Sequence, residues 1–184
     1  YPETVEMLLL SGSNGRNQVP VSKVGKIVAK TMMTVMGSEK EAELIRNAQD
    51  LMFNKKIRNR SKKSDWLSTN ESEVGKYLQS NDMGFSFTTS AYYYLFNGIC
   101  QNFNGINLRR IPEEMPVLIF SGDRDPVGDY GKGPENLEKM YKKNGLKNVQ
   151  LMLYENRRHE LFNEGNREQV IEDVTEFIKK NLPS

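Results

Sequence analysis

The sequence has 184 residues, of which 37% are hydrophobic, so its length suits a globular domain and its composition is too apolar for a disordered chain. Its net charge of +2 is too small to indicate a nucleic-acid partner, and no apolar run reaches the roughly 20 residues of a membrane-spanning helix. One cysteine and one histidine exclude an internal disulfide bond and a multi-histidine metal site. Because the lone Cys100 is consistent with a reducing compartment, we expect a cytoplasmic protein.

The first part of the chain predicts one strand followed by helices. An apolar run at residues 5–10 ends in a turn-rich stretch at 11–15, which is typical of a buried strand followed by a loop. Apolar side chains between residues 24 and 35 then keep a helical period, and Gly37 predicts the end of that helix. No convincing strand follows before about residue 110, so the middle of the chain is expected to be helical.

Capping patterns place the helices of this middle region. Ser38 with Glu41 has the spacing of a capping box and predicts the start of a second helix, and Asn70 with Glu73 repeats the pattern before a third. A fourth helix is expected from near Thr89.

The last third alternates between strands and helices. A continuous apolar run at 116–121 predicts a strand that is buried on both faces, and residues 149–154 predict the next strand. A helix is expected from Pro134, and another after Asn166 with Pro183 as its stop. Such alternation predicts an α/β fold with a parallel sheet and crossover helices. Three strands make a narrow sheet, so we expect further strands upstream or additional cover from the helical region.

Two loops at the carboxyl ends of the predicted strands carry reactive side chains. In doubly wound sheets, ligands and catalytic groups lie at these ends. Asp123 and Asp125 follow the first of the two strands, and His159, the only histidine, follows the second. A carboxylate on one loop that orients an imidazole on the next is two thirds of a nucleophilic triad.

At these loops the sequence resembles α/β-hydrolases of the lysophospholipase and monoacylglycerol lipase type. The C-terminal part of that family is similar to Phe-Ser-Gly-Asp-Arg-Asp-Pro-Val-Gly at 120–128, to Arg158-His159-Glu160, and to Asn163-Glu164 with the helix that follows. The opening residues up to Gly12 resemble the strand after the nucleophile's helix. The helical region, with Asp65-Trp66-Leu67 and residues 84–87, resembles the lid.

The resemblance implies a catalytic pair and its missing partner. Asp125 corresponds to the family's acid and His159 to its base, in the chain order serine, aspartate, histidine. The nucleophilic serine and the oxyanion-binding loop are then expected upstream of Tyr1, so we interpret the chain as the C-terminal portion of a larger serine hydrolase. That portion alone is expected to be inactive.

This interpretation divides the chain into three parts. Residues 1–15 are expected to form a core strand and turn, 16–112 a helical lid inserted into an α/β-hydrolase sheet, and 113–184 the C-terminal core with the acid and base loops. Methionine and aromatic side chains adapt to flexible ligands, so part of the lid is expected to face an acyl chain. The candidate substrate-binding residues are Phe85, Phe87, Tyr92, Leu95 and Val127.

The expected reaction is the hydrolysis of carboxylic esters of lipid-like substrates, without a metal or an organic cofactor. The expected partners are such an ester, the N-terminal part of the same hydrolase and, transiently, a membrane surface, with no nucleic acid. The alternative is a non-catalytic α/β binding or scaffold module that keeps an apolar lid pocket.

Three features compete with these assignments. Ser13 lies in a Ser-Gly-Ser-Asn-Gly turn that approaches a nucleophile elbow, but Pro20 argues against a helix directly behind it. Asp123 competes with Asp125 for the role of the acid and is otherwise expected to form the loop. The basic segment between Lys55 and Lys63 could attract phospholipid or nucleic acid, but it lacks interleaved aromatic residues, which favours a solvated connection between helices.

Overall fold

The computed structural model describes residues 4–57 and 62–182. The part of the basic segment at 58–61 and the predicted stop at Pro183 lie outside this range.

Three parallel strands form the sheet, as predicted. They are β1 (Leu8–Ser11), β2 (Val117–Gly122) and β3 (Val149–Tyr154), in the order β1-β2-β3. Ile119 in the middle of β2 pairs with Leu10 on one side and Leu151 on the other. Since all three strands run the same way, their carboxyl ends meet at one edge of the sheet.

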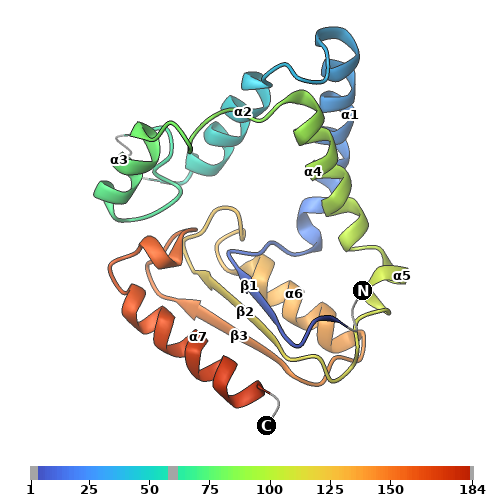
Figure 1. Ribbon diagram of the computed structural model, residues 1–184, viewed down its shortest axis with the longest axis vertical. Helices are drawn as coiled ribbons and strands as arrows, with labels where there is room; N and C mark the ends of the chain where they lie inside the picture. Colours follow the sequence, from blue (N-terminus) through green and yellow to red (C-terminus); the bar gives the residue numbers. More distant parts are fainter. Residues whose placement is uncertain (1–3, 58–61, 183–184) are drawn as a thin grey trace.

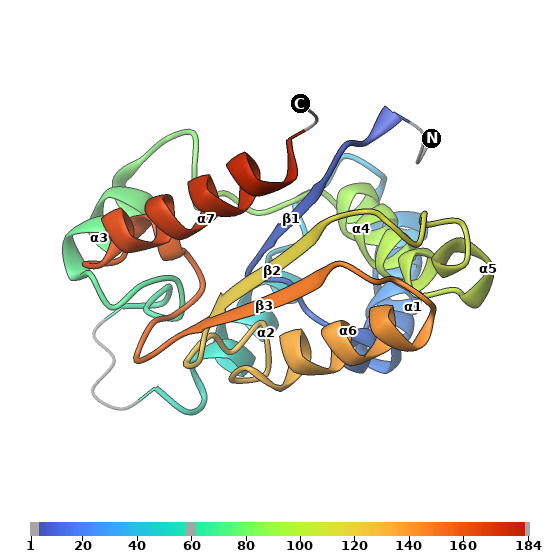
Figure 2. The same cartoon turned by 90° about the horizontal axis from the view of Figure 1, so that it is seen from below.

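Two helices cover the opposite faces of this sheet (Figure 2). α6 (Lys132–Lys143) packs against one face, where alternate residues of β2 such as Ile119 meet Leu137. α7 (Arg167–Asn181) packs against the other, where Phe120 belongs to a cluster with Val170, Val174 and Phe177. β2 is therefore buried along its whole length, which explains its unbroken apolar sequence.

The segment between β1 and β2 is helical and extends away from the sheet (Figure 1). The arrowheads of β2 and β3 point toward α2 and α3. α1 and α4 pack together around Ala29, Tyr92 and Phe96. The helices of this segment are α1 (Val19–Met36), α2 (Glu43–Asn54), α3 (Glu71–Gln79), α4 (Thr89–Asn102) and α5 (Gly105–Leu108).

The start of α1 corrects one expectation from the sequence. A short 3-10 helix, η2 (Arg16–Gln18), leads directly into α1, which begins at Val19 with Pro20 in its first turn. Proline is tolerated there because the first amides of a helix have no intrahelical partner. Pro20 is thus no obstacle to a helix that starts soon after the turn at 11–15.

The predicted capping box of Ser38 and Glu41 is also wrong. α2 begins only at Glu43, and Glu41 pairs with Thr88 in an isolated antiparallel bridge. The Thr89 hydroxyl donates to the carbonyl of Ser38 at 3.1 Å. This contact between distant segments outweighs the local capping preference. Asn70 does cap α3, accepting from the amide of Ser72 at 3.1 Å.

α7 begins directly after Asn166, as predicted. Asn166 occupies the N-cap position, but its side chain makes no capping hydrogen bond. The side-chain Nε2 of Gln169 donates to the carboxylate of Asp173 at 2.9 Å.

Among residues 4–57 and 62–182, no helix has both the length and the apolar character required to cross a bilayer. Within the same part of the chain, β1 pairs with β2 alone, so its other edge carries no strand.

Candidate active site

Asp125 lies in the loop between β2 and α6 and is fully buried. Oδ1 of its carboxylate accepts a hydrogen bond from the amide of Val127 at 2.8 Å. Oδ2 accepts from the hydroxyl of Ser121, the penultimate residue of β2, at 3.3 Å. These donors satisfy a carboxylate that burial would otherwise destabilise, and they orient Oδ2.

His159 lies in the loop after β3 and faces this carboxylate. Its Nδ1 is 2.9 Å from Oδ2 of Asp125, within hydrogen-bond distance. A carboxylate only accepts, so the hydrogen lies on Nδ1 and the lone pair of the neutral ring on Nε2. The structure therefore brings the two predicted loops together, in the arrangement of a general base and the acid that orients it.

Glycine permits the close approach of these loops. A Cβ on Gly122 would lie 2.0 Å from the carbonyl oxygen of Arg157, which the amide of Arg124 binds at 2.9 Å. Gly12, at the end of β1, has a φ of +58°, and a Cβ there would lie 2.8 Å from Nδ1 of His159. The imidazole therefore packs directly against the backbone of Gly12, at the carboxyl end of β1.

The two competing residues occupy other positions. Asp123 accepts a hydrogen bond from the amide of Asn156 at 2.7 Å, so it connects the two loops without binding the imidazole. Ser13 lines a hollow beside β1 together with Leu8 and Leu10, whereas His159 lines a different cavity. Asp125 is the better candidate for the acid, and Ser13 has no observed relation to the base.

A cavity of about 550 Å³ opens at His159. Helices α2, α3 and α4 contribute to its walls, and apolar side chains dominate them. The five predicted substrate-binding residues all line this cavity: Phe85, Phe87, Tyr92, Leu95 and Val127. Residues that lie far apart in the sequence are thus gathered around His159 at the carboxyl edge of the sheet.

The cavity also contains residues that the sequence did not single out as ligand contacts. The ring of Trp66 lies 5.3 Å from the ring of His159, and its Nε1 donates to Asp50 at 3.1 Å. Tyr77 shares the wall with Tyr92, and burial raises the pKa of both phenols, so both stay neutral at neutral pH. The helical period of α2 and α3 shows which faces are apolar but not that these faces converge on a histidine about 100 positions later.

Two lysines of the basic segment make contacts within the protein. Nζ of Lys56 lies 4.3 Å from the ring centre of Tyr130, in the loop after Asp125. Nζ of Lys62 donates to the backbone carbonyl of Glu71 at 2.9 Å. These contacts favour a structural role for this part of the segment.

Comparison with known proteins identifies the family. Residues 1–166 match the family described as serine aminopeptidase, S33. The chain belongs to this family. The match spans both candidate loops and the helical segment between β1 and β2. A search of curated proteins found no significant match.

Solved structures of similar fold agree with this membership. A thermostable carboxyl esterase from Bacillus coagulans superposes with a TM-score of 0.82 at 23% identity, covering 96% of this chain and 57% of the esterase. The monoacylglycerol lipase of Paleococcus ferrophilus has a TM-score of 0.66 at 15% identity, with 98% and 61% coverage. A monoglyceride lipase from Saccharomyces cerevisiae has a TM-score of 0.65 at 14% identity, with 98% and 55% coverage. The fold is that of an α/β-hydrolase, and the chain spans somewhat more than half of each of these proteins.

Proposed function

We propose that the protein hydrolyses carboxylic esters of lipid-like substrates, of the monoacylglycerol or lysophospholipid class. The proposal assigns His159 as the general base and Asp125 as the residue that orients it. A serine upstream of Tyr1, with oxyanion-binding amides from the same region, completes the site. The observation that carries the proposal is the Asp125–His159 hydrogen bond at the mouth of a largely apolar cavity.

The proposed reaction follows from the geometry of this pair. Nε2 of His159 takes the proton of the serine hydroxyl as its oxygen attacks the ester carbonyl. The imidazolium, stabilised by Asp125 through Nδ1–H, then protonates the departing alkoxide as the bond between carbonyl carbon and alcohol oxygen breaks. Water attacks the resulting acyl-serine with the same base, which releases the carboxylic acid and restores the serine.

The shape and polarity of the cavity support a lipid-like substrate. Phe85, Phe87 and Leu95 offer partly exposed apolar surface in the wall of the cavity. Arg46 and Asp50 add polar groups to the same wall. Such a lining suits an acyl chain joined to a small polar alcohol. The names of the esterase and the two glyceride lipases with this fold give the proposal further support.

The test compares His159→Ala with the unchanged protein in the complete hydrolase. We expect the turnover of a medium-chain monoacylglycerol to fall by several orders of magnitude, while binding of the free fatty acid changes by no more than a few-fold. The imidazole stabilises the transition state specifically, whereas the cavity wall binds the substrate and the transition state about equally.

The family's description names an aminopeptidase, so an amino-acid amide is assayed in parallel with the ester. If the protein prefers the amide, the proposed ester substrate is wrong and a peptide is the substrate. Unimpaired ester turnover by His159→Ala would refute the mechanism, because His159 is the general base that the mechanism requires. Ligand binding without turnover of either substrate would favour the non-catalytic binding module.

A further inference from the structure

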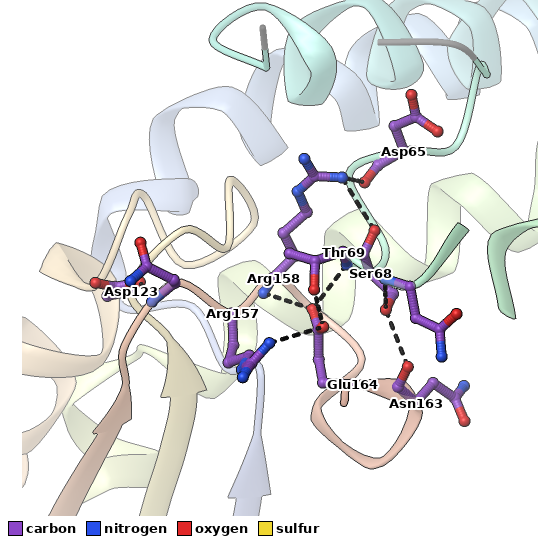
Figure 3. Close-up of polar contacts among 10 residues, drawn as sticks. Asp65, Ser68, Thr69, Asp123, Arg157, Arg158, Asn163 and Glu164 are labelled. Atoms are coloured by element: carbon purple, nitrogen blue, oxygen red, sulfur yellow. Dashed lines mark hydrogen bonds and ion pairs between the residues drawn. The ribbon is translucent and has the colours of Figure 1, made fainter. Parts of the chain in front are cut away.

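A buried carboxylate connects the histidine loop to the helical segment above it (Figure 3). Glu164 directly follows the 3-10 helix η3 (Leu161–Asn163), and its side chain has 0% exposure. Its Oε1 accepts from the backbone amide of Arg158 at 2.9 Å, and from the backbone amide of Thr69 at 2.9 Å. Its Oε2 accepts from the Thr69 hydroxyl and lies 3.9 Å from Nη1 of Arg157.

Further hydrogen bonds join the same two parts of the chain. We call residues 65–69, which connect α2 to α3, the docking segment. Nη1 of Arg158 donates to the carbonyl of Asp65 at 2.5 Å and to that of Ser68 at 3.0 Å. The amide of Glu160 donates to the carbonyl of Leu67 at 2.8 Å, and the Ser68 hydroxyl donates to the carbonyl of Asn163 at 3.0 Å.

These contacts hold the residues on both sides of His159 in the sequence. The residues before and after it, Arg158 and Glu160, are both bound to the docking segment. The carbonyl of Arg157, the residue before Arg158, accepts from the amide of Arg124 in the loop after β2. The path of the backbone at His159 therefore depends on the docking segment, which also places Trp66 beside the imidazole.

Glu164 has a central place in this arrangement because it receives donors from both sides. Loss of its carboxylate would leave the backbone amides of Arg158 and Thr69 without this acceptor. A buried carboxylate is also costly unless such donors are present, so Glu164 and the docked arrangement depend on each other.

We propose that Glu164 is a positioning residue that couples the docking segment to His159, so that the base is held against Asp125 only while the helical segment is docked. This inference rests on the proposed ester hydrolysis for its catalytic consequence. Movement of the docking segment would release Arg158 and Glu160 together and displace the imidazole from the carboxylate.

The test uses Glu164→Ala and Glu164→Gln in the complete hydrolase. We expect Glu164→Ala to lower kcat by about 10- to 100-fold with KM within about threefold, since the base is displaced while most of the cavity wall lies outside residues 65–69 and remains. Amide hydrogen exchange should rise together in peptides that cover residues 64–70 and 156–163. Glu164→Gln keeps one acceptor oxygen and can donate to the Thr69 hydroxyl, so we expect it to restore kcat to within about fivefold and to restore protection.

Two further variants complete the test, the first as a control and the second as an independent probe of the docking contacts. Glu168→Ala removes an exposed carboxylate four residues later, and it should leave kcat and both peptides unchanged. Ser68→Ala removes one contact between the segments without leaving a buried charge unpaired. If Glu164→Ala does not fold, Ser68→Ala should still lower kcat by a few-fold and raise exchange in both peptides.

An unchanged kcat in Glu164→Ala despite increased exchange would overturn the proposal, because the base would then keep its place without the docking segment. Increased exchange in one peptide alone would overturn it as well. Absence of ester turnover in the unchanged protein would instead refute the proposed function, and the exchange data would still decide whether Glu164 couples the two segments.

Discussion

Two aspartates in the loop after β2 have different hydrogen-bond partners. Asp125 binds the imidazole, whereas Asp123, two positions earlier, binds only the backbone of the neighbouring loop. The two aspartates therefore form a natural pair for mutation, with the same chemistry and different partners.

We predict that Asp125→Asn lowers kcat/KM for the ester by about 10³- to 10⁴-fold. The amide oxygen or nitrogen cannot hold the imidazole in the required tautomer as a carboxylate does. Asp123→Asn keeps an acceptor for the amide of Asn156, so its kcat/KM should change by no more than a few-fold. Steady-state kinetics of both variants check this, and the reverse order would reassign the acid.

Gly122, at the end of β2, occupies a position with no room for a side chain. In Gly122→Ala the new methyl group would overlap the carbonyl of Arg157, so the histidine loop must move. We predict a loss of about 1–3 kcal/mol in the free energy of unfolding, together with a fall in kcat.

Gly98→Ala is the matched control, because nothing lies within 4 Å of a Cβ at this position inside α4. It should stabilise the protein by about 0.5–1 kcal/mol. Chemical denaturation measures both changes, and equal stability of the two variants would contradict the predicted close approach.

Helices and strands are joined by specific polar contacts as well as by apolar packing. Tyr154 at the end of β3 donates to Asp173 of α7 at 2.8 Å, which fixes the helix against this face of the sheet. Burial, and then the hydrogen bond to Asp173, raise the pKa of the Tyr154 phenol.

This raised pKa makes a prediction about alkaline stability. In the unfolded chain the phenol loses its proton near pH 10, whereas in the folded protein it keeps the proton to higher pH. Its contribution to stability is thus complete below about pH 10 and is lost as pH rises toward the folded pKa.

Tyr154→Phe should cost about 1 kcal/mol at neutral pH and should show a smaller further loss above about pH 10 than the unchanged protein. Urea denaturation at pH 8 and at pH 10.5 tests this. An identical alkaline slope in both proteins would contradict the assigned cause.

The molecule presents a second apolar surface besides the cavity at His159. A groove of about 390 Å³ runs between α1 and α2 and shares Phe53 and Phe96 with the cavity at His159. Val24, which lines it, is 63% exposed. α1 also carries three lysines and no acidic residue, and an anionic lipid interface attracts positive charge of this kind.

We predict that Val24→Asp lowers activity on an emulsified long-chain ester by about tenfold, because a charge in the groove opposes contact with an interface. Activity on a soluble short-chain ester should be unchanged. Assays with the two substrates separate these effects, and an equal loss on both would indicate damage to the site rather than to interfacial contact.

Much of the secondary structure, and the pairing of Asp125 with His159, could be predicted from the sequence alone. The strand at Val149–Tyr154 and the helix end at Gly37 are encoded locally, by apolar runs and by a residue free to adopt a φ of +99°. Asp125 and His159 could be selected because parallel strands bring their carboxyl ends together, and because the chain has one histidine.

Only the tertiary structure decided the details that depend on contacts between distant segments. Ser38 and Glu41 have a capping pattern, yet pairing with residues 88–89 delays α2. The role of Glu164 depends on Thr69, 95 positions earlier, and that of Trp66 on its place beside His159. Local sequence sets backbone preferences of about 1 kcal/mol per residue. The start of α2 and the contacts of Glu164 and Trp66 depend instead on interactions between distant segments, which exist only once the chain has folded.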